Sequence, residues 1–96
     1  MKTVQVTISE ADNLRFERAR YEAAALENIM AVITTRMDDD GTAFQRFLPR
    51  YMGALKELDR CKADLERDYM TAYPARVRWV LEPETRVMTV YLREDG

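Results

Sequence analysis

Arginine and tyrosine are the residue types in this chain best suited to binding a ligand. Four of them recur near the C-terminus, at Arg76, Arg78, Tyr91 and Arg93. A guanidinium group binds phosphate through paired hydrogen bonds, and both guanidinium groups and phenol rings stack on nucleobases. On one face of a sheet, these residues would form a nucleic-acid-binding surface. The alternative interpretation is the ordinary solvated face of an antiparallel sheet.

Few other residues offer chemistry. The chain has no His and a single cysteine, Cys61, which excludes the common zinc sites, an internal disulfide and the Ser-His and Cys-His catalytic pairs. The acidic run Asp38-Asp39-Asp40 lacks the spacing of an EF-hand and is typical of a solvated turn. We therefore expect a protein that is not an enzyme and that needs no metal or cofactor. A nuclease working through Arg and Tyr is a minor alternative.

Length and composition indicate the class of protein that carries these residues. A chain of 96 residues fits a single domain, residues 1–96, and its 47% apolar and 33% charged content is that of a globular protein. The net charge of −2 lacks the basic excess of a non-specific nucleic-acid binder. No apolar run reaches the length of a signal peptide or a membrane span, so we expect a cytoplasmic protein with no membrane contact.

Two long helices follow a short N-terminal strand. Residues 2–8 alternate apolar and polar side chains, as a strand with one buried face does. A helix is predicted from Ser9 to Met37, and a second from Thr42 to Tyr73 with a capping box at its start. We favour one bent helix through Pro49; the alternative is a turn over 42–48 with Pro49 opening the helix. Gly53 inside this helix predicts a close approach by another group.

The last quarter of the chain predicts a β-hairpin over residues 75–82 and 85–93. Pairing Glu82 with Thr85 sets Val80 opposite Val87 and sorts apolar from polar side chains onto two faces. Arg76 and Arg78 then share the polar face with Tyr91 and Arg93. The predicted fold is α+β, in the order β-α-α-β-β: a three-stranded antiparallel sheet with a long antiparallel helical hairpin packed on one face.

Both helices carry an apolar line at three- and four-residue spacing, as coiled-coil packing of an antiparallel hairpin requires. The lines are Phe16, Ala19, Ala23, Leu26, Met30, Ile33 and Met37, and Phe44, Phe47, Tyr51, Ala54, Leu58, Cys61 and Leu65. The first helix has a second apolar line, which we expect to face the sheet. It consists of Leu14, Tyr21, Ala25 and Val32, and Ile29 lies between the two lines.

The helices are too long for the sheet. A seven-residue strand spans about 23 Å, whereas each helix spans about 42 Å, so about 20 Å of hairpin is left unsupported. This end, called the hairpin tip, concentrates more large apolar side chains than two helices can bury against each other. We expect it to be an assembly or binding surface, with these residues as its centre: Met30, Ile33, Met37, Phe44, Phe47 and Met52.

The leading functional hypothesis is a non-enzymatic protein-interaction module: a small adaptor, inhibitor or regulatory protein that forms a homodimer or higher homo-oligomer and docks on another macromolecule. The sequence does not identify that protein partner. The alternative is a nucleic-acid-binding protein that uses the Arg and Tyr residues of the sheet. These hypotheses predict different surfaces, the hairpin tip and the outer sheet face.

Overall fold

The computed structural model describes residues 2–36 and 41–93. Their order is β1 (Lys2–Thr7), α1 (Glu10–Arg36), α2 (Thr42–Tyr69), β2 (Arg76–Glu82) and β3 (Val87–Leu92). The predicted α+β class is confirmed, with two long helices in contact and a three-stranded antiparallel sheet. The chain divides into two compact units. The sheet unit contains the strands with residues up to Arg15 and from Ala63 onward, and the hairpin unit is Phe16–Lys62.

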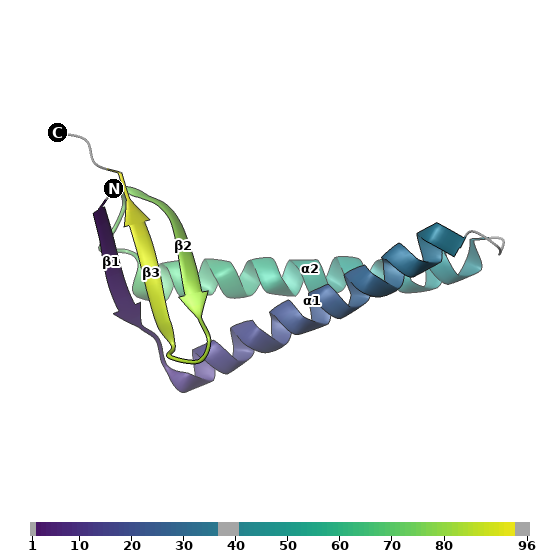
Figure 1. Ribbon diagram of the computed structural model, residues 1–96, viewed down its shortest axis with the longest axis horizontal. Helices are drawn as coiled ribbons and strands as arrows, with labels where there is room; N and C mark the ends of the chain where they lie inside the picture. Colours follow the sequence, from purple (N-terminus) through teal and green to yellow (C-terminus); the bar gives the residue numbers. More distant parts are fainter. Residues whose placement is uncertain (1, 37–40, 94–96) are drawn as a thin grey trace. The chain divides into compact units, whose positions relative to one another are not determined.

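The sheet has the strand order β1-β3-β2, with β3 in the middle (Figure 1). β1 joins β3 in the register that places Val4 opposite Val90 and Val6 opposite Met88. On β2, Trp79 lies opposite Val90 and Leu81 opposite Met88. Since residues directly opposite each other share a face, these apolar pairs form the inner face.

The hairpin register differs from the prediction by two residues. Glu82 pairs with Val87 and Val80 with Thr89, so the connecting turn is the four residues 83–86 rather than two. The turn closes with a hydrogen bond from the Arg86 N–H to the Glu82 carbonyl at 2.9 Å, and Arg86 has a positive φ of 60°. A shift by two residues keeps every side chain on its face, which is why the predicted alternation survived an incorrect turn.

A β-bulge corrects the predicted position of Arg76. The pairing is irregular between Arg76 and Arg78, and Arg76 lies opposite Leu92 rather than beside the outer residues. An extra residue in one strand reverses the alternation beyond it, so Arg76 shares the inner face and Val77 is 53% exposed. The sequence offers no Gly or Pro that marks this bulge.

Arg76 instead stabilises the end of α2. Its guanidinium donates to the carbonyl oxygens of Met70, at 3.4 Å, and Tyr73, at 3.2 Å, and its Nε lies 3.6 Å from Glu66 Oε1. Both carbonyls belong to the turn that follows α2, where they also accept hydrogen bonds from the backbone N–H groups of Tyr73 and Arg76. The helix ends at Tyr69, four residues earlier than predicted.

The start of α1 follows the predicted capping. The Ser9 hydroxyl accepts a hydrogen bond from the Asp12 N–H at 3.1 Å, as an N-cap residue does. The Tyr69 hydroxyl accepts from the Ser9 N–H at 3.0 Å and donates to the Asp12 carboxylate at 2.7 Å. This chain of hydrogen bonds joins the first turn of α1 to the last turn of α2 within the sheet unit.

Two further features complete the sheet unit. Its core contains Ile8, Leu65, Met70, Leu81, Met88 and Val90, all of them buried. Outside this core, Asp64 pairs with Arg15 at 2.7 Å and Arg67 at 3.1 Å. The hydrogen bond to Asp68, and then the charges of Asp68 and Asp64, raise the pKa of Arg67 above its ordinary value.

The hairpin unit confirms one continuous second helix. Pro49 lies inside α2, as the favoured prediction states, rather than at its start. The helix begins at Thr42, and its Gln45 N–H donates to the carbonyl of Gly41, which has a φ of 87°. No described part of the chain makes the close approach predicted at Gly53: apart from the helix's own backbone, a Cβ atom placed there would meet no described atom within 4 Å.

The two helices of the hairpin unit contact each other through the predicted lines. Ala23 and Leu26 of α1 and Ala54 of α2 form a buried cluster, against which Phe47, Tyr51, Leu55 and Leu58 pack. Cys61 is buried at 2% exposure, as expected of an apolar contact position. Met37 and the acidic residues 38–40 lie outside the described residues.

Candidate interaction surface on the helical hairpin

The second apolar line of α1 is exposed. Tyr21 is 61%, Ile29 37% and Val32 52% accessible to solvent, and Ala25 between them is also exposed. Leu14, in the sheet unit, is 46% exposed. The expectation that this line faces the sheet is therefore wrong. We call Tyr21, Ala25, Ile29 and Val32 the α1 stripe.

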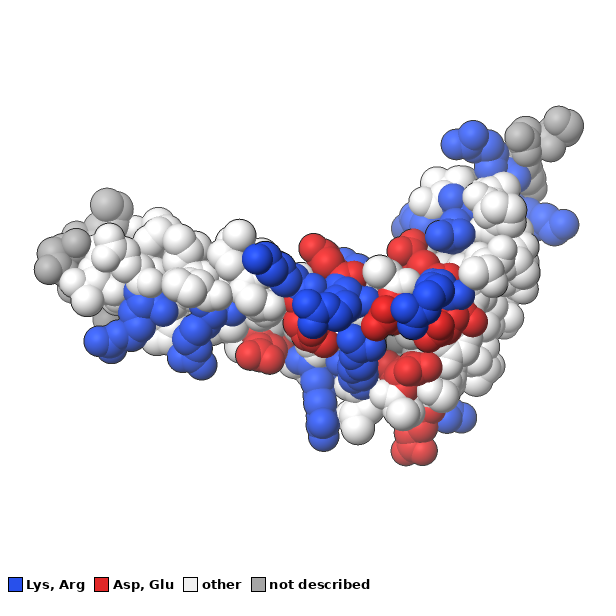
Figure 2. All heavy atoms as spheres, turned by 180° about the vertical axis from the view of Figure 1, so that it is seen from behind, with Lys and Arg blue, Asp and Glu red and all other residues white. Residues whose placement is uncertain are grey.

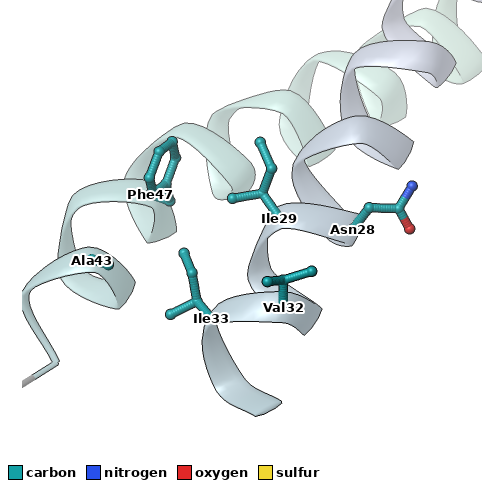
Figure 3. Close-up of a pocket in the computed structure, with 6 residues that line it drawn as sticks. All are labelled: Asn28, Ile29, Val32, Ile33, Ala43 and Phe47. Atoms are coloured by element: carbon teal, nitrogen blue, oxygen red, sulfur yellow. The ribbon is translucent and has the colours of Figure 1, made fainter. Parts of the chain in front are cut away.

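At its C-terminal end the α1 stripe borders a groove between the two helices (Figure 3). In Figure 3, Ile29 and Ile33 extend from α1 toward α2, which contributes Phe47 and Ala43. The groove has a volume of about 340 Å³. We call it the tip groove; it is lined by Asn28, Ile29, Val32, Ile33, Ala43 and Phe47.

On α2, the charged side chains described nearest the tip groove are basic. Among the described residues 28–36 and 41–56 there is no Asp or Glu, whereas Arg46, Arg50 and Lys56 are present. Figure 2 shows this end, beside the grey atoms, as uncharged surface bordered by basic groups, with acidic groups farther along the hairpin. The guanidinium of Arg50 lies 5.6 Å from the centre of the Phe47 ring, which holds one cation beside the groove.

The described members of the predicted tip set divide between three environments. Ile33 and Phe47 are half-buried and meet in the tip groove. Met30 is 8% exposed and belongs to the packing between the helices. Phe44 and Met52, at 38% and 48% exposure, follow Ala43 by one and nine residues, and so lie about 100° and 180° around α2 from it.

The predicted tip set omits Ile29 and Val32, which line the tip groove. Val32 belongs to the apolar line that was expected to face the sheet, Ile29 lies between the two lines, and the spacing of both was visible in the sequence. No apolar periodicity marks Asn28 and Ala43, because one side chain is polar and the other small. They line the groove only because of where the neighbouring side chains lie. A one-dimensional pattern identifies an apolar face but not whether that face is covered.

The outer sheet face keeps three of its four predicted polar residues. Arg78 lies opposite Tyr91, with its guanidinium 4.3 Å from the ring centre, and Arg93 is exposed just beyond β3. Thr3 lies opposite Tyr91 on the other side. With Arg76 on the inner face, the arrangement is one arginine–aromatic stack beside a single exposed arginine.

Among residues 2–36 and 41–93, no group of three or more His, Cys, Asp or Glu side chains is placed to hold a metal ion. Within the same ranges, neither helix combines the length and the apolar character needed to cross a membrane.

Comparison of the chain with models of known protein families, with curated proteins and with solved structures found no match.

Proposed function

We propose that the chain is a non-enzymatic protein-interaction module that self-associates through its helical hairpin. The observation that carries this proposal is the tip groove together with the α1 stripe. Both expose large apolar side chains along one side of the hairpin unit, Val32 being 52% and Tyr21 61% accessible. Burying apolar surface is favourable by about 25 cal/mol per Å², and an exposed groove of this kind marks an interaction surface on a soluble protein.

The same hairpin offers a second surface for another macromolecule. Phe44 and Met52 are exposed on α2 and do not line the tip groove. Met side chains adapt to differently shaped contacts, because they are unbranched and polarizable. An adaptor or regulatory role requires such a division, with one surface for assembly and another for a different protein.

Self-association is tested by titrating a fluorescently labelled chain with unlabelled chain and following anisotropy. Anisotropy is expected to rise, with its midpoint at a micromolar or lower concentration of unlabelled chain. The Val32→Glu variant is expected to bind at least about 100-fold more weakly, because association would bury an unpaired charge. Ala31→Glu is the matched control, since Ala31 is exposed on the same helix but does not line the groove. Equal binding by both variants would contradict the proposal.

Phe47→Asp is a second disruptive variant, read together with its circular dichroism, because Phe47 also packs on the buried cluster. Tyr21→Glu serves where Phe47→Asp unfolds the hairpin, since Tyr21 is 61% exposed.

Nucleic-acid binding by the sheet face is the competing outcome. It predicts binding of single-stranded RNA or DNA that weakens steeply with salt and that Arg78→Ala removes. Such binding, with no self-association, would replace the proposed function.

A further inference from the structure

We propose that the free edge of β1 pairs with β1 of a second copy, in antiparallel orientation, about a twofold axis at Gln5. The two sheets then form one continuous sheet with the strand order β2-β3-β1-β1-β3-β2. This surface belongs to the sheet unit and does not include the tip groove. The proposal therefore goes beyond the proposed function and does not rest on it.

The backbone of β1 has hydrogen-bonding groups that face away from the sheet. β1 lies at one edge, with β3 beside it on one side (Figure 1). The Ile8 N–H donates to the Arg86 carbonyl at 2.9 Å, and in an antiparallel ladder alternate residues direct their backbone groups toward the neighbouring strand. The N–H and carbonyl groups of Thr3, Gln5 and Thr7 therefore point away from β3, and no described strand pairs with them.

Residues 3–7 leave this edge open to another strand. They contain no charged residue, glycine or proline, and their pairing with β3 has no bulge. The opposite edge strand, β2, has a bulge and carries Arg76, Arg78 and Glu82. Charges, prolines and bulges are the means by which proteins prevent edge strands from pairing with other molecules. Since β2 is protected in this way and β1 is not, β1 is the edge that accepts a partner strand.

The sequence of β1 identifies the partner strand as another copy of β1. Residues 3–7 read Thr-Val-Gln-Val-Thr, which is the same in both directions. With the axis at Gln5, Thr3 lies opposite Thr7 of the other copy, Val4 lies opposite Val6, and Gln5 lies opposite itself. Every residue thus meets its own type, and the free backbone groups of both strands meet. Thr–Thr pairs hydrogen-bond across antiparallel strands, and β-branched side chains pack well against cross-strand neighbours.

Pairing also covers side chains that a single chain leaves half-buried. Val4 and Val6 are half-buried on the inner face, whereas Val90 and Met88, which lie opposite them on β3, are fully buried. The twofold axis is perpendicular to the sheet, so the inner faces of the two copies lie on the same side. Val4 of each copy therefore packs beside Val6 of the other, and both lose exposed apolar surface.

The charges at the ends of the paired stretch fit this register. Lys2 lies opposite Ile8 of the other copy, and the acidic residues Glu10 and Asp12 follow Ile8 in the first turn of α1. Arg86 is bonded to Ile8 on the β3 side, one strand farther from Lys2. Like charges opposite each other would destabilise the pair, and none lie opposite each other between residues 2 and 8.

The paired stretch is short, which sets the concentration at which it forms. Two segments of this length bury far less than the roughly 1,200 Å² of the smallest stable interfaces. We therefore expect a dissociation constant in the millimolar range, roughly 1 mM. Copies that associate through the hairpin at micromolar concentration are then linked into larger assemblies at millimolar concentration.

Cysteine cross-linking tests the pairing in the Val32→Glu background, which lacks association through the hairpin. Gln5→Cys sets two thiols at the axis, where paired Cα atoms lie about 5.5 Å apart, within the range of a disulfide. At millimolar concentration, mild oxidation is expected to convert most of this variant to a disulfide-linked dimer. Thr3→Cys is the matched control, because the two copies of residue 3 lie about 14 Å apart along the strands and cannot form a disulfide.

A mixture of Thr3→Cys and Thr7→Cys in the same background tests the register. These positions lie opposite each other when the axis is at Gln5, so the mixture is expected to cross-link although neither variant does alone. The background without an added cysteine gives the contribution of Cys61, which is only 2% exposed. Cross-linking of Thr3→Cys with itself as fast as that of Gln5→Cys would overturn the proposal.

Gln5→Pro gives a readout that needs no added thiol. Its N–H does not take part in pairing with β3, and proline is tolerated where an edge strand turns its N–H to solvent. In the Val32→Glu background, the amide resonances of residues 3–7 are expected to shift between about 0.1 and 2 mM protein, and Gln5→Pro is expected to remove the concentration dependence. Gln5→Lys replaces it where proline disrupts the strand by circular dichroism, because two like charges then meet at the axis.

Spectra of the Val32→Glu variant that stay constant up to about 2 mM would overturn the pairing of β1. This result would leave the proposed function intact, because the anisotropy of the wild-type chain tests the hairpin surface at micromolar concentration. Conversely, wild-type chains that do not associate at micromolar concentration, but pair through β1 at millimolar concentration, would overturn the proposed function alone.

Discussion

At the scale of single residues, Asn13 connects α1 to the β2–β3 turn. It is 8% exposed, and its side-chain amide donates to the Pro83 carbonyl at 3.0 Å. Asn13→Ala is expected to lower the free energy of unfolding by about 1–2 kcal/mol, because it leaves this carbonyl without its partner. Urea denaturation followed by circular dichroism measures the change. Gln5→Ala, at an exposed amide in the same unit, should change it by less than about 0.5 kcal/mol, and an equal loss in both variants would contradict this role.

The backbone of Arg86 is strained, and the energetic cost of this conformation depends on the type of residue at the position. Its φ of 60° lies in the left-handed region, which costs an L-residue about 1–2 kcal/mol and a β-branched residue more. The contacts that hold this conformation are backbone hydrogen bonds to Glu82 and Ile8, so substitution preserves them. Arg86→Gly is expected to keep or raise the thermal midpoint, and Arg86→Val to lower it. A reversed order in calorimetry would show that the side chain, and not φ, matters.

At the scale of elements, the bulge in β2 separates a structural arginine from exposed ones. Arg76→Ala is expected to lower the free energy of unfolding by about 1–2 kcal/mol, since it removes hydrogen bonds to two carbonyls in the turn after α2 and the contact with Glu66. Arg93→Ala, an exposed arginine in the same unit, should change it by less than about 0.5 kcal/mol. Urea denaturation compares the two, and equal effects would place Arg76 on the solvated face after all.

Gly53 weakens α2 without a compensating contact. No atom lies within 4 Å of the position that a Cβ would occupy, so Gly53→Ala adds helix propensity and no clash. The free energy of unfolding is expected to rise by about 0.5–1 kcal/mol. A decrease, measured by chemical denaturation, would mean that Gly53 serves a contact beyond the single chain.

Element type was predictable here, and the local exceptions were not. The alternation of Val4, Val6 and Ile8 and the long Gly- and Pro-poor stretch of α1 give unambiguous periodicities, so strands and helices fell where expected. The bulge at Val77 and the four-residue turn ending at Arg86 depend on backbone hydrogen bonds between distant segments, which residue types do not reveal. The α1 stripe was recognised as apolar, but residue types do not tell whether another part of the chain covers it.

At the scale of the whole molecule, self-association couples stability to concentration. A partner that binds only the folded state stabilises it by mass action, so the thermal midpoint of an associating protein rises with protein concentration. We expect the midpoint of the wild-type chain to rise between micromolar and hundred-micromolar concentrations. The midpoint of Val32→Glu should be independent of concentration, and Ala31→Glu should behave as wild type. A constant wild-type midpoint would argue against a folded dimer.

The most direct test of the central claim is the mass of the wild-type chain in solution. One chain has a mass of 11.3 kDa. If the tip groove and the α1 stripe take up a second copy, light scattering at increasing micromolar concentrations should report a mass that rises toward twice this value. A mass that stays at that of one chain throughout, with the fold intact by circular dichroism, would contradict the account.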